Sequence, residues 1–330
     1  MNNQHIIDSN KAASDIDQPT IPVGISACLA GDKVRYNGGH TQSRLCLDLL
    51  SQCFKFTTFC PEVEAGFGTP RPTMRLIGNP ASPQLVFSND STSNLTEQLV
   101  KGFEKKLPEM SHLDGYILMK NSPSCGLERI KVYLPNGNPH QIRTAGVFAK
   151  ALKQQYPLMP IEEEGRLHDD KLFDNFVLRV YAHSNFRKEV LEQPSLHNLI
   201  IFHSRYKYLL MAHNQDKYRA LGRLLGGNTS VPLATLINTY FCDFMEVLSK
   251  PSSRKNHTNA LFHILGYLKG NLTSVAREHI IEVIHNYNKG ITPLTTPLTL
   301  LKHHLMQHGS TYIQHQRYFE PYPEKISPVI

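Results

Sequence analysis

Three cysteines of this 330-residue chain lie in loops made of small or conformationally restricted residues. Cys28 lies in "SACLAGD", Cys60 in "FCPEVEAG" and Cys125 in "SPSCG". Glycine lets the backbone approach a ligand closely, and proline fixes the direction of the chain. No pair of cysteines has the CxxC spacing of a zinc ribbon or a thioredoxin-like redox site. Three thiolates with no evident fourth ligand suit an iron–sulfur cluster with one open iron. The alternative is three unrelated loop cysteines.

The other three cysteines have surroundings typical of packed side chains. Cys46 and Cys53 are seven residues apart in a predicted helix at residues 43–53, so they share one face of that helix. Cys242 lies in the apolar stretch "YFCDFMEVL". A free cysteine usually behaves as a small buried hydrophobic side chain. We therefore expect these three to pack inside the protein.

Two of the cysteine loops also carry groups that could move protons. In an extended chain Glu62 points to the same side as Cys60, where a carboxylate can act as a general base. Glu64 is two residues further on and could take that role instead. Ser122 precedes a proline, and the tight loop can bring its hydroxyl near Cys125. The alternatives are a solvated loop acid and a hydroxyl that caps a turn.

The elements before these loops predict how the cysteines meet. Short apolar runs at residues 22–27, 54–59 and 115–120 each stop just before one of the loop cysteines. Helical patterns between them, at 93–107 and 144–155 among others, predict an α/β domain with a mainly parallel, Rossmann-like sheet. The carboxyl ends of parallel strands line one edge of a sheet, where ligands bind. The three thiols should therefore converge although they are far apart in the sequence.

The second half of the chain reads as an all-helical domain, with no convincing strand pattern. We divide the chain into a disordered tail (1–19), a catalytic domain (20–160), a linker with a connecting helix (161–195) and an all-helical domain (196–330). The helices expected in the last domain are 197–212, 216–226, 231–249, 256–269, 273–288 and 297–317.

Composition excludes several classes of protein. No apolar run approaches the ~20 residues needed to cross a bilayer, and the N-terminus lacks the pattern of a signal peptide. We expect a cytoplasmic protein, in which disulfides are unlikely. From residue 196 onward 14 Lys and Arg stand against 7 Asp and Glu, which accounts for the whole net charge of +7. This charge indicates either a solvated, slightly basic surface or a footprint for nucleic acid.

Three stretches together carry a resemblance to a known family. "ISACLAGDKVRYNGG", "FCPEVEAGFGTPRP" and "KNSPSCG" resemble the thiouracil desulfidases, whose members hold a 4Fe-4S cluster on three cysteines. The resemblance covers roughly residues 20–160. Residues 196–322 look like the helical domain that is often fused behind it. This two-domain arrangement is similar to that of the bacterial desulfidases that remove sulfur from 4-thiouridine in transfer RNA.

The resemblance implies a role for each candidate residue. Cys28, Cys60 and Cys125 would bind the 4Fe-4S cluster, Glu62 would transfer protons, and Ser122 would assist. The sulfur of the thiocarbonyl would bind the open iron, and Glu62 would activate a water to attack the ring carbon. The products would be uridine and hydrosulfide, with no net redox change.

The partner that the resemblance implies is transfer RNA. A base inside folded RNA must be turned out to reach a recessed cluster, and phosphate contacts from Lys and Arg can supply the energy. Candidates in the helical domain are Lys207, Arg219, Arg223, Arg254, Lys255, Lys302 and Arg317. Arg71 and Arg75 could hold a flanking phosphate beside the cysteine loop.

Two other functions remain open at this stage. The chain could be a desulfidase of free thiouracil, or a non-catalytic iron–sulfur regulator that binds RNA. Nothing in the sequence implies a protein partner or an oligomeric state.

Overall fold

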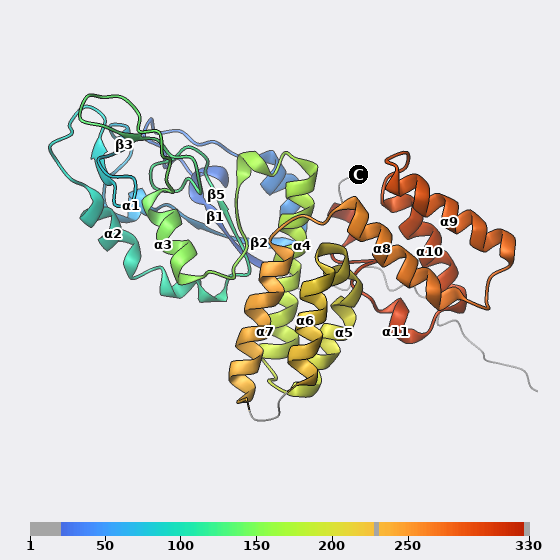
Figure 1. The fold of residues 1–330 in the computed structure, drawn as a ribbon. Coiled ribbons are helices and arrows are strands. Elements are labelled where there is room, and N and C mark those ends of the chain that lie inside the picture. The colour runs from blue at the N-terminus through green and yellow to red at the C-terminus, as the bar shows by residue number, and fades with distance from the viewer. Residues whose placement is uncertain (1–20, 228–230, 327–330) are drawn as a thin grey trace, which may run out of the picture.

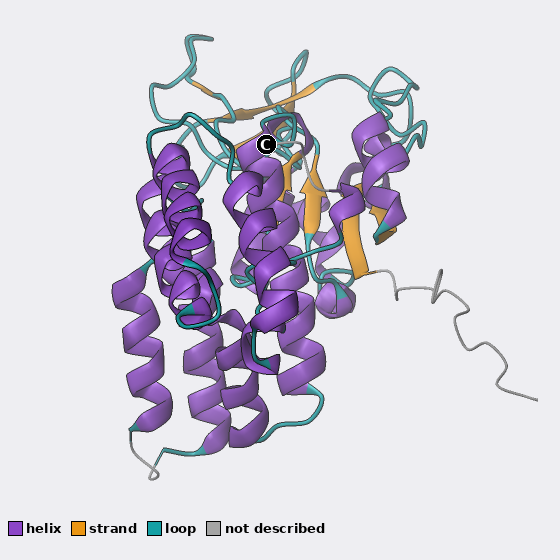
Figure 2. Cartoon of the chain, turned by 90° about the vertical axis from the view of Figure 1, so that its right-hand side faces the viewer, coloured by secondary structure: helices purple, strands orange, loops and turns teal. Residues whose placement is uncertain are grey.

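The computed structural model describes residues 21–227 and 231–326, so the predicted tail at 1–19 lies outside the described residues. Strands gather in the N-terminal part, and helices make up nearly all of the remainder (Figure 1, Figure 2). The predicted fold class, an α/β region followed by an all-α region, is confirmed.

The central sheet has four strands in the order β2-β1-β5-β7, and every neighbouring pair is parallel. The strands are β1 (Ile21–Ser26), β2 (Phe54–Phe59), β5 (Tyr116–Leu118) and β7 (Ile161–Glu163). In β1 and β5 nearly every residue is buried, as expected for parallel strands that are covered on both faces.

Strand β7 comes from residues that the sequence analysis placed in the linker. Its three residues, Ile-Glu-Glu, are too few and too polar to show a strand pattern. The polarity is tolerated because Glu162, although buried, accepts a hydrogen bond of 2.8 Å from Nε of Arg166. The connection to the helical region therefore begins inside the sheet.

A second, smaller sheet has the order β4-β3-β6. It contains β3 (Met74–Ile77), β4 (Gln84–Phe87) and β6 (Val132–Tyr133). Strand β6 lies within the apolar stretch "IKVYL" at 130–134, which has the composition of a short strand. The other two strands were missed, since prolines surround them in the sequence.

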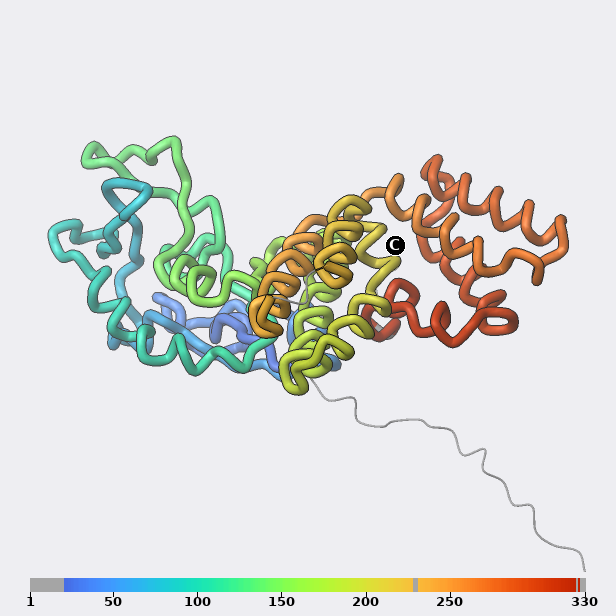
Figure 3. Tube along the Cα trace, turned by 60° about the horizontal axis from the view of Figure 1, so that its bottom comes forward, coloured from blue at the N-terminus to red at the C-terminus, as the bar shows by residue number. Residues whose placement is uncertain are grey.

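Short helices α1 (Pro61–Glu64), α2 (Thr96–Glu104) and α3 (Val147–Gln155) accompany the strands, followed by a chain of helices to the C-terminus. These later helices are α4 (Asp170–Phe186), α5 (Leu196–His213), α6 (Gln215–Gly226), α7 (Leu233–Leu248), α8 (Arg254–Leu265), α9 (Ser274–Asn288), α10 (Thr295–His308) and α11 (Thr311–Gln314). Helices α8–α11 lie at the end of the molecule opposite the strand β3 (Figure 1, Figure 3).

Five of the six predicted C-terminal helices form, but the one expected at 297–317 is divided. Helix α10 ends at His308, and the chain turns at Gly309 before α11. A Cβ atom at Gly309 would lie 2.5 Å from the carbonyl oxygen of Leu305, so the turn needs glycine.

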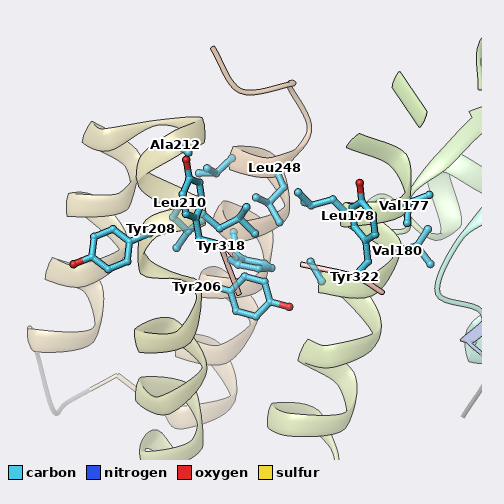
Figure 4. Close-up of a cluster of buried hydrophobic side chains, with 14 of the residues drawn as sticks. Val177, Leu178, Val180, Tyr206, Tyr208, Leu210, Ala212, Leu248, Tyr318 and Tyr322 are labelled. Atoms are coloured by element: carbon cyan, nitrogen blue, oxygen red, sulfur yellow. The ribbon is translucent and has the colours of Figure 1, made fainter. Parts of the chain in front are cut away.

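One hydrophobic core joins the sheet to the helices. It runs from Val23 and Ile25 of β1 through α4 to α5, α7 and α8 without a break. Figure 4 shows its middle part, where Leu178 and Tyr206 lie among buried side chains of several helices. A second core, around Phe148, packs on the other side of the sheet. No helix in the described ranges is long and apolar enough to cross a membrane.

Gly24 offers a test of the packing at the centre of the sheet. We expect Gly24→Ala to lower the free energy of unfolding by about 1–3 kcal/mol, because the added Cβ would lie 2.2 Å from Cδ2 of the buried Tyr116. Gly226→Ala is the matched control, since nothing lies within 4 Å of its added Cβ. Urea denaturation measures both, and equal midpoints for the two variants would contradict the packing described.

Candidate functional site

The three loop cysteines line one cavity of about 350 Å³ at the carboxyl ends of β1, β2 and β5. Cys28 lies two residues after β1, Cys60 directly after β2, and Cys125 in the loop that follows β5. These strands are neighbours in the sheet, so thiols that are up to 97 positions apart in the sequence meet. Glu62 and Ser122 line the same cavity. These five residues therefore line one cavity, as the sequence predicts.

The backbone around Cys60 differs from the expectation. The expected segment from Cys60 to Glu62 was extended, but Cys60 is the N-cap of the short helix α1. Pro61 occupies the first helical position, where its fixed φ is favourable. Burial raises the pKa of the Cys60 thiol, and the backbone N–H groups of Val63 and Glu62 oppose that rise. The assumed geometry was wrong, although Glu62 still reaches the cavity.

Glu62 is held by an ion pair that no sequence pattern indicated. Arg71, only 8% exposed, contacts the Glu62 carboxylate and donates hydrogen bonds of 3.0 and 2.8 Å to the carbonyl oxygens of Val34 and Gly68. Its guanidinium thus faces inward, where it orients the acid. Glu64 is exposed and does not line this cavity.

The loop of Cys125 is fixed by side chains from two directions. The Ser122 hydroxyl accepts hydrogen bonds from the N–H groups of Ser124 and Cys125, at 3.2 and 3.0 Å. Ser122 therefore caps a turn, which was the alternative to a role in proton transfer. Its side chain also lines the cavity. From β7, Glu163 accepts a bond of 2.9 Å from the N–H of Leu127. The hydroxyl of Ser26, at the end of β1, favours the thiolate of Cys125 and so opposes the rise in its pKa that burial causes.

Burial and mutual repulsion keep these thiols protonated in the metal-free protein. Burial raises the pKa of the Cys28 thiol to about 11, the neighbouring Cys60 adds to the rise, and Arg35 opposes it. Burial also raises the pKa of Cys60, and it raises that of Cys125 further, with Glu62 as the next cause. Three thiols that oppose each other's ionisation favour a cation among them, which would replace their protons.

The donor set has the chemistry that a metal–sulfur cluster requires. Within residues 21–227 and 231–326, no group of three or more His, Cys, Asp or Glu side chains has the geometry for one metal ion. Three soft sulfur donors around one cavity therefore fit an iron–sulfur cluster.

Cys46 and Cys53 are buried as expected, but Cys242 is exposed, so its predicted packing was wrong. Helix α7 buries the face that carries Tyr240, Phe241 and Phe244. Cys242 lies on the opposite face, which the apolar composition of the segment concealed.

Most of the candidate RNA-binding cations of the helical region are engaged within the chain. Lys302 pairs with Glu320, Arg317 with Glu189 at 3.2 Å, and Arg219 with Asp216 at 3.6 Å. Arg254 donates a bond of 2.7 Å to the carbonyl oxygen of Tyr287. Two further candidates, Arg223 and Lys255, are exposed without an ion pair among the described residues.

Lys207 has a different environment, formed by aromatic rings. Its Nζ lies 5.0 Å from the ring centre of Tyr208 and 6.0 Å from that of Tyr312. The rings of Tyr267 and Tyr312 are 6.1 Å apart, and each side chain is more than a third exposed. We call Lys207, Tyr208, Tyr267 and Tyr312 the tyrosine patch.

The raised pKa of Cys28 leads to a test on the metal-free protein. We expect its alkylation by iodoacetamide to be slow at neutral pH and to quicken about tenfold per pH unit, because only the thiolate reacts. The rate should level off near the pKa of about 11. Arg35→Gln should move the curve to higher pH, since Arg35 lowers this pKa. Peptide mass spectrometry follows the reaction, and a plateau below ~pH 9 would contradict the described burial.

Comparison with known proteins divides the chain as the fold does. Residues 23–164 match the family model of 2-thiouracil desulfurase, and residues 207–323 match that of a protein of unknown function, DUF1722. YbgA, an uncharacterized protein of Escherichia coli, is 30% identical over 155 residues, which are 47% of this chain and 92% of YbgA. YbbK, an uncharacterized protein of Bacillus subtilis, is 33% identical over 138 residues, which are 39% of this chain and 88% of YbbK.

Among solved structures, the 4Fe-4S-dependent thiouracil desulfidase TudS matches with 28% identity and a TM-score of 0.36, over 46% of this chain and 95% of TudS. The family models and the two curated relatives lead to one conclusion: through residues 23–164 the chain belongs to the 2-thiouracil desulfurase family, and it continues into a DUF1722 region.

Proposed function

We propose that the protein is a 4Fe-4S-dependent desulfidase that converts 4-thiouridine in transfer RNA to uridine. The observation that carries this proposal is the single cavity in which three thiols from three strands meet a carboxylate held by a buried arginine. Cys28, Cys60 and Cys125 would bind the cluster. When bound, the cluster would supply an open iron that attracts the soft sulfur of the thiocarbonyl group and draws electrons from the ring carbon.

Glu62 is the acid–base residue of the proposed reaction. Its carboxylate lines the cavity, where it can take a proton from the water that attacks the ring carbon. Arg71 holds the carboxylate in one orientation and balances its charge, and both side chains are largely buried. Ser122 fixes the Cys125 loop through two backbone N–H groups. Replacement of sulfur by the oxygen of water needs no net electron transfer, so no reductant is required.

Two features of the helical half support RNA as the substrate, and the size of the cavity sets how an RNA must present its base. A cavity of about 350 Å³ has room for a pyrimidine base but not for a folded RNA, so the base must be turned out of its stack. The helical half carries the whole net positive charge of the chain. Its tyrosine patch combines the exposed rings of Tyr267 and Tyr312 with Lys207, a combination that binds unstacked bases. Free thiouracil needs neither of the last two features, and a non-catalytic regulator has no use for the Glu62–Arg71 pair.

Activity on thiolated transfer RNA tests the function. We expect the protein, reconstituted without oxygen, to remove the near-ultraviolet absorbance of 4-thiouridine. Glu62→Gln should slow the reaction by about 10²–10⁴-fold while the cluster absorbance is kept. Glu64→Gln is the matched control, because Glu64 is exposed and does not line the cavity, and it should retain nearly full activity. An intact absorbance band with a fully loaded cluster would rule the proposed function out.

Cluster binding is tested separately by measuring iron per chain. We expect Cys28→Ser, Cys60→Ser and Cys125→Ser each to lose the bound iron and its visible absorbance, because each removes one of three ligands. Cys242→Ser should keep both, since Cys242 is exposed and does not line the cavity. Retention of a full cluster in two of the three ligand variants would refute the ligand set.

A further inference from the structure

A second cavity, of about 480 Å³, adjoins the cysteine cavity. The two share Met74, Asn121 and Pro123 as a common wall. We call the second one the basic cavity, because its lining includes Arg75, Arg129 and Lys131. A group bound there would therefore be a neighbour of a group bound beside the cysteines.

The charge of the basic cavity is not balanced by acids. None of its lining residues is an Asp or a Glu. In the described part of the chain, no carboxylate lies within 4.0 Å of the charged nitrogens of Arg75, Arg129 or Lys131, by contrast with the paired Arg71. Three cations without counter-charges around one hollow are suited to bind an anion.

Arg75 is held in place but keeps donor capacity. Its Cζ lies 5.4 Å from the ring centre of Tyr133, and one guanidinium nitrogen donates a bond of 3.0 Å to Ser91. Its Nε is buried and has no hydrogen-bond partner. A buried donor without a partner is costly, and an anion in the cavity would satisfy it.

The backbone of this wall is unusual at two positions. Asn121 and Arg129 have φ angles of 59° and 62°, and they are the only non-glycine residues with positive φ in the described ranges. Both line the basic cavity. For an arginine this conformation costs roughly 1–2 kcal/mol, and such strain tends to persist where it positions a functional side chain.

We infer that the basic cavity binds a phosphate group of the nucleotide chain that carries the thiolated base. This inference rests on the proposed function and extends it from the base to its backbone. A base in the cysteine cavity has its ribose and phosphate close by, and the adjoining wall leads to the three cations. Arginine binds phosphate oxygens through paired hydrogen bonds, which a neutral nucleoside cannot accept. Of the two arginines expected beside the cysteine loop, Arg75 is free for this role, whereas Arg71 is used by Glu62.

The test compares substrates with and without phosphate. The variant Arg75→Gln/Arg129→Asn/Lys131→Gln removes the three cations, and asparagine tolerates the left-handed backbone at position 129. We expect kcat/KM to fall by about 10- to 100-fold for 4-thiouridine 5′-monophosphate and for thiolated transfer RNA. For 4-thiouracil and 4-thiouridine it should change by less than about twofold, since these lack the phosphate.

A matched control removes the same charge elsewhere. Lys55→Gln/Lys105→Gln/Lys153→Gln replaces three exposed lysines that line neither cavity. It should lower activity on neither class of substrate by more than about twofold. Circular dichroism and the urea midpoint show that both triple variants are folded. Equal losses in the two variants would mean that overall charge, and not this cavity, attracts the phosphate.

A binding measurement separates this inference from the proposed function. The metal-free protein should bind uridine 5′-monophosphate at least tenfold more tightly than uridine by calorimetry, and the Arg75 triple variant should lose that preference. This result does not require turnover, so it stands even if thiolated transfer RNA proves not to be a substrate. If the Arg75 triple variant loses activity on thiolated transfer RNA but not on 4-thiouridine 5′-monophosphate, the cavity binds a neighbouring phosphodiester. If it loses activity on both substrates, the cavity binds the phosphate of the thiolated nucleotide. No preference for the monophosphate, with no effect on RNA, would overturn the inference.

Discussion

The site depends on the parallel pairing of β1 with β2 on one side and with β5 on the other. Parallel pairing places the ends of three strands at one edge, and each end leads into a loop that carries a cysteine. Gly24 allows β1 to lie this close to β5, because the ring of Tyr116 occupies the space above it. A change in the register or order of these strands would separate the thiols, whatever the loops themselves contained.

The same convergence creates an electrostatic problem inside the cavity. Three thiols and the Glu62 carboxylate would all be negative when ionised, and burial makes each charge costly. Arg71 at the Glu62 carboxylate and Arg35 near Cys28 compensate part of this negative charge. The remaining imbalance is met by protons in the metal-free protein, and it would be met by iron in the proposed active form. Affinity for a cationic cluster and a raised pKa are thus two results of one arrangement.

The sequence allowed the sheet edge and its cysteines to be predicted, because a strand pattern that stops before a cysteine is a local signal. Long-range partners were not predictable in this way. Arg71 contacts Val34, which is 37 positions away, and Glu163 contacts Leu127, which is 36 positions away, and no periodicity marks either pair. Strand β7 was missed because three residues carry too little pattern. Arg129 could not be identified as a candidate binding residue from the sequence, because only the folded chain places it in the basic cavity.

The uninterrupted core between sheet and helices has a consequence for how a large substrate is chosen. The helical region shares one hydrophobic core with β1, so it cannot move as a separate body on a flexible linker. The tyrosine patch and the cysteine cavity therefore stand at a fixed separation. The molecule would then select an RNA by the distance between its two contact points. An RNA that touches both places must already have the matching span and curvature, and selection would fall on the shape of the folded nucleic acid as much as on the modified base.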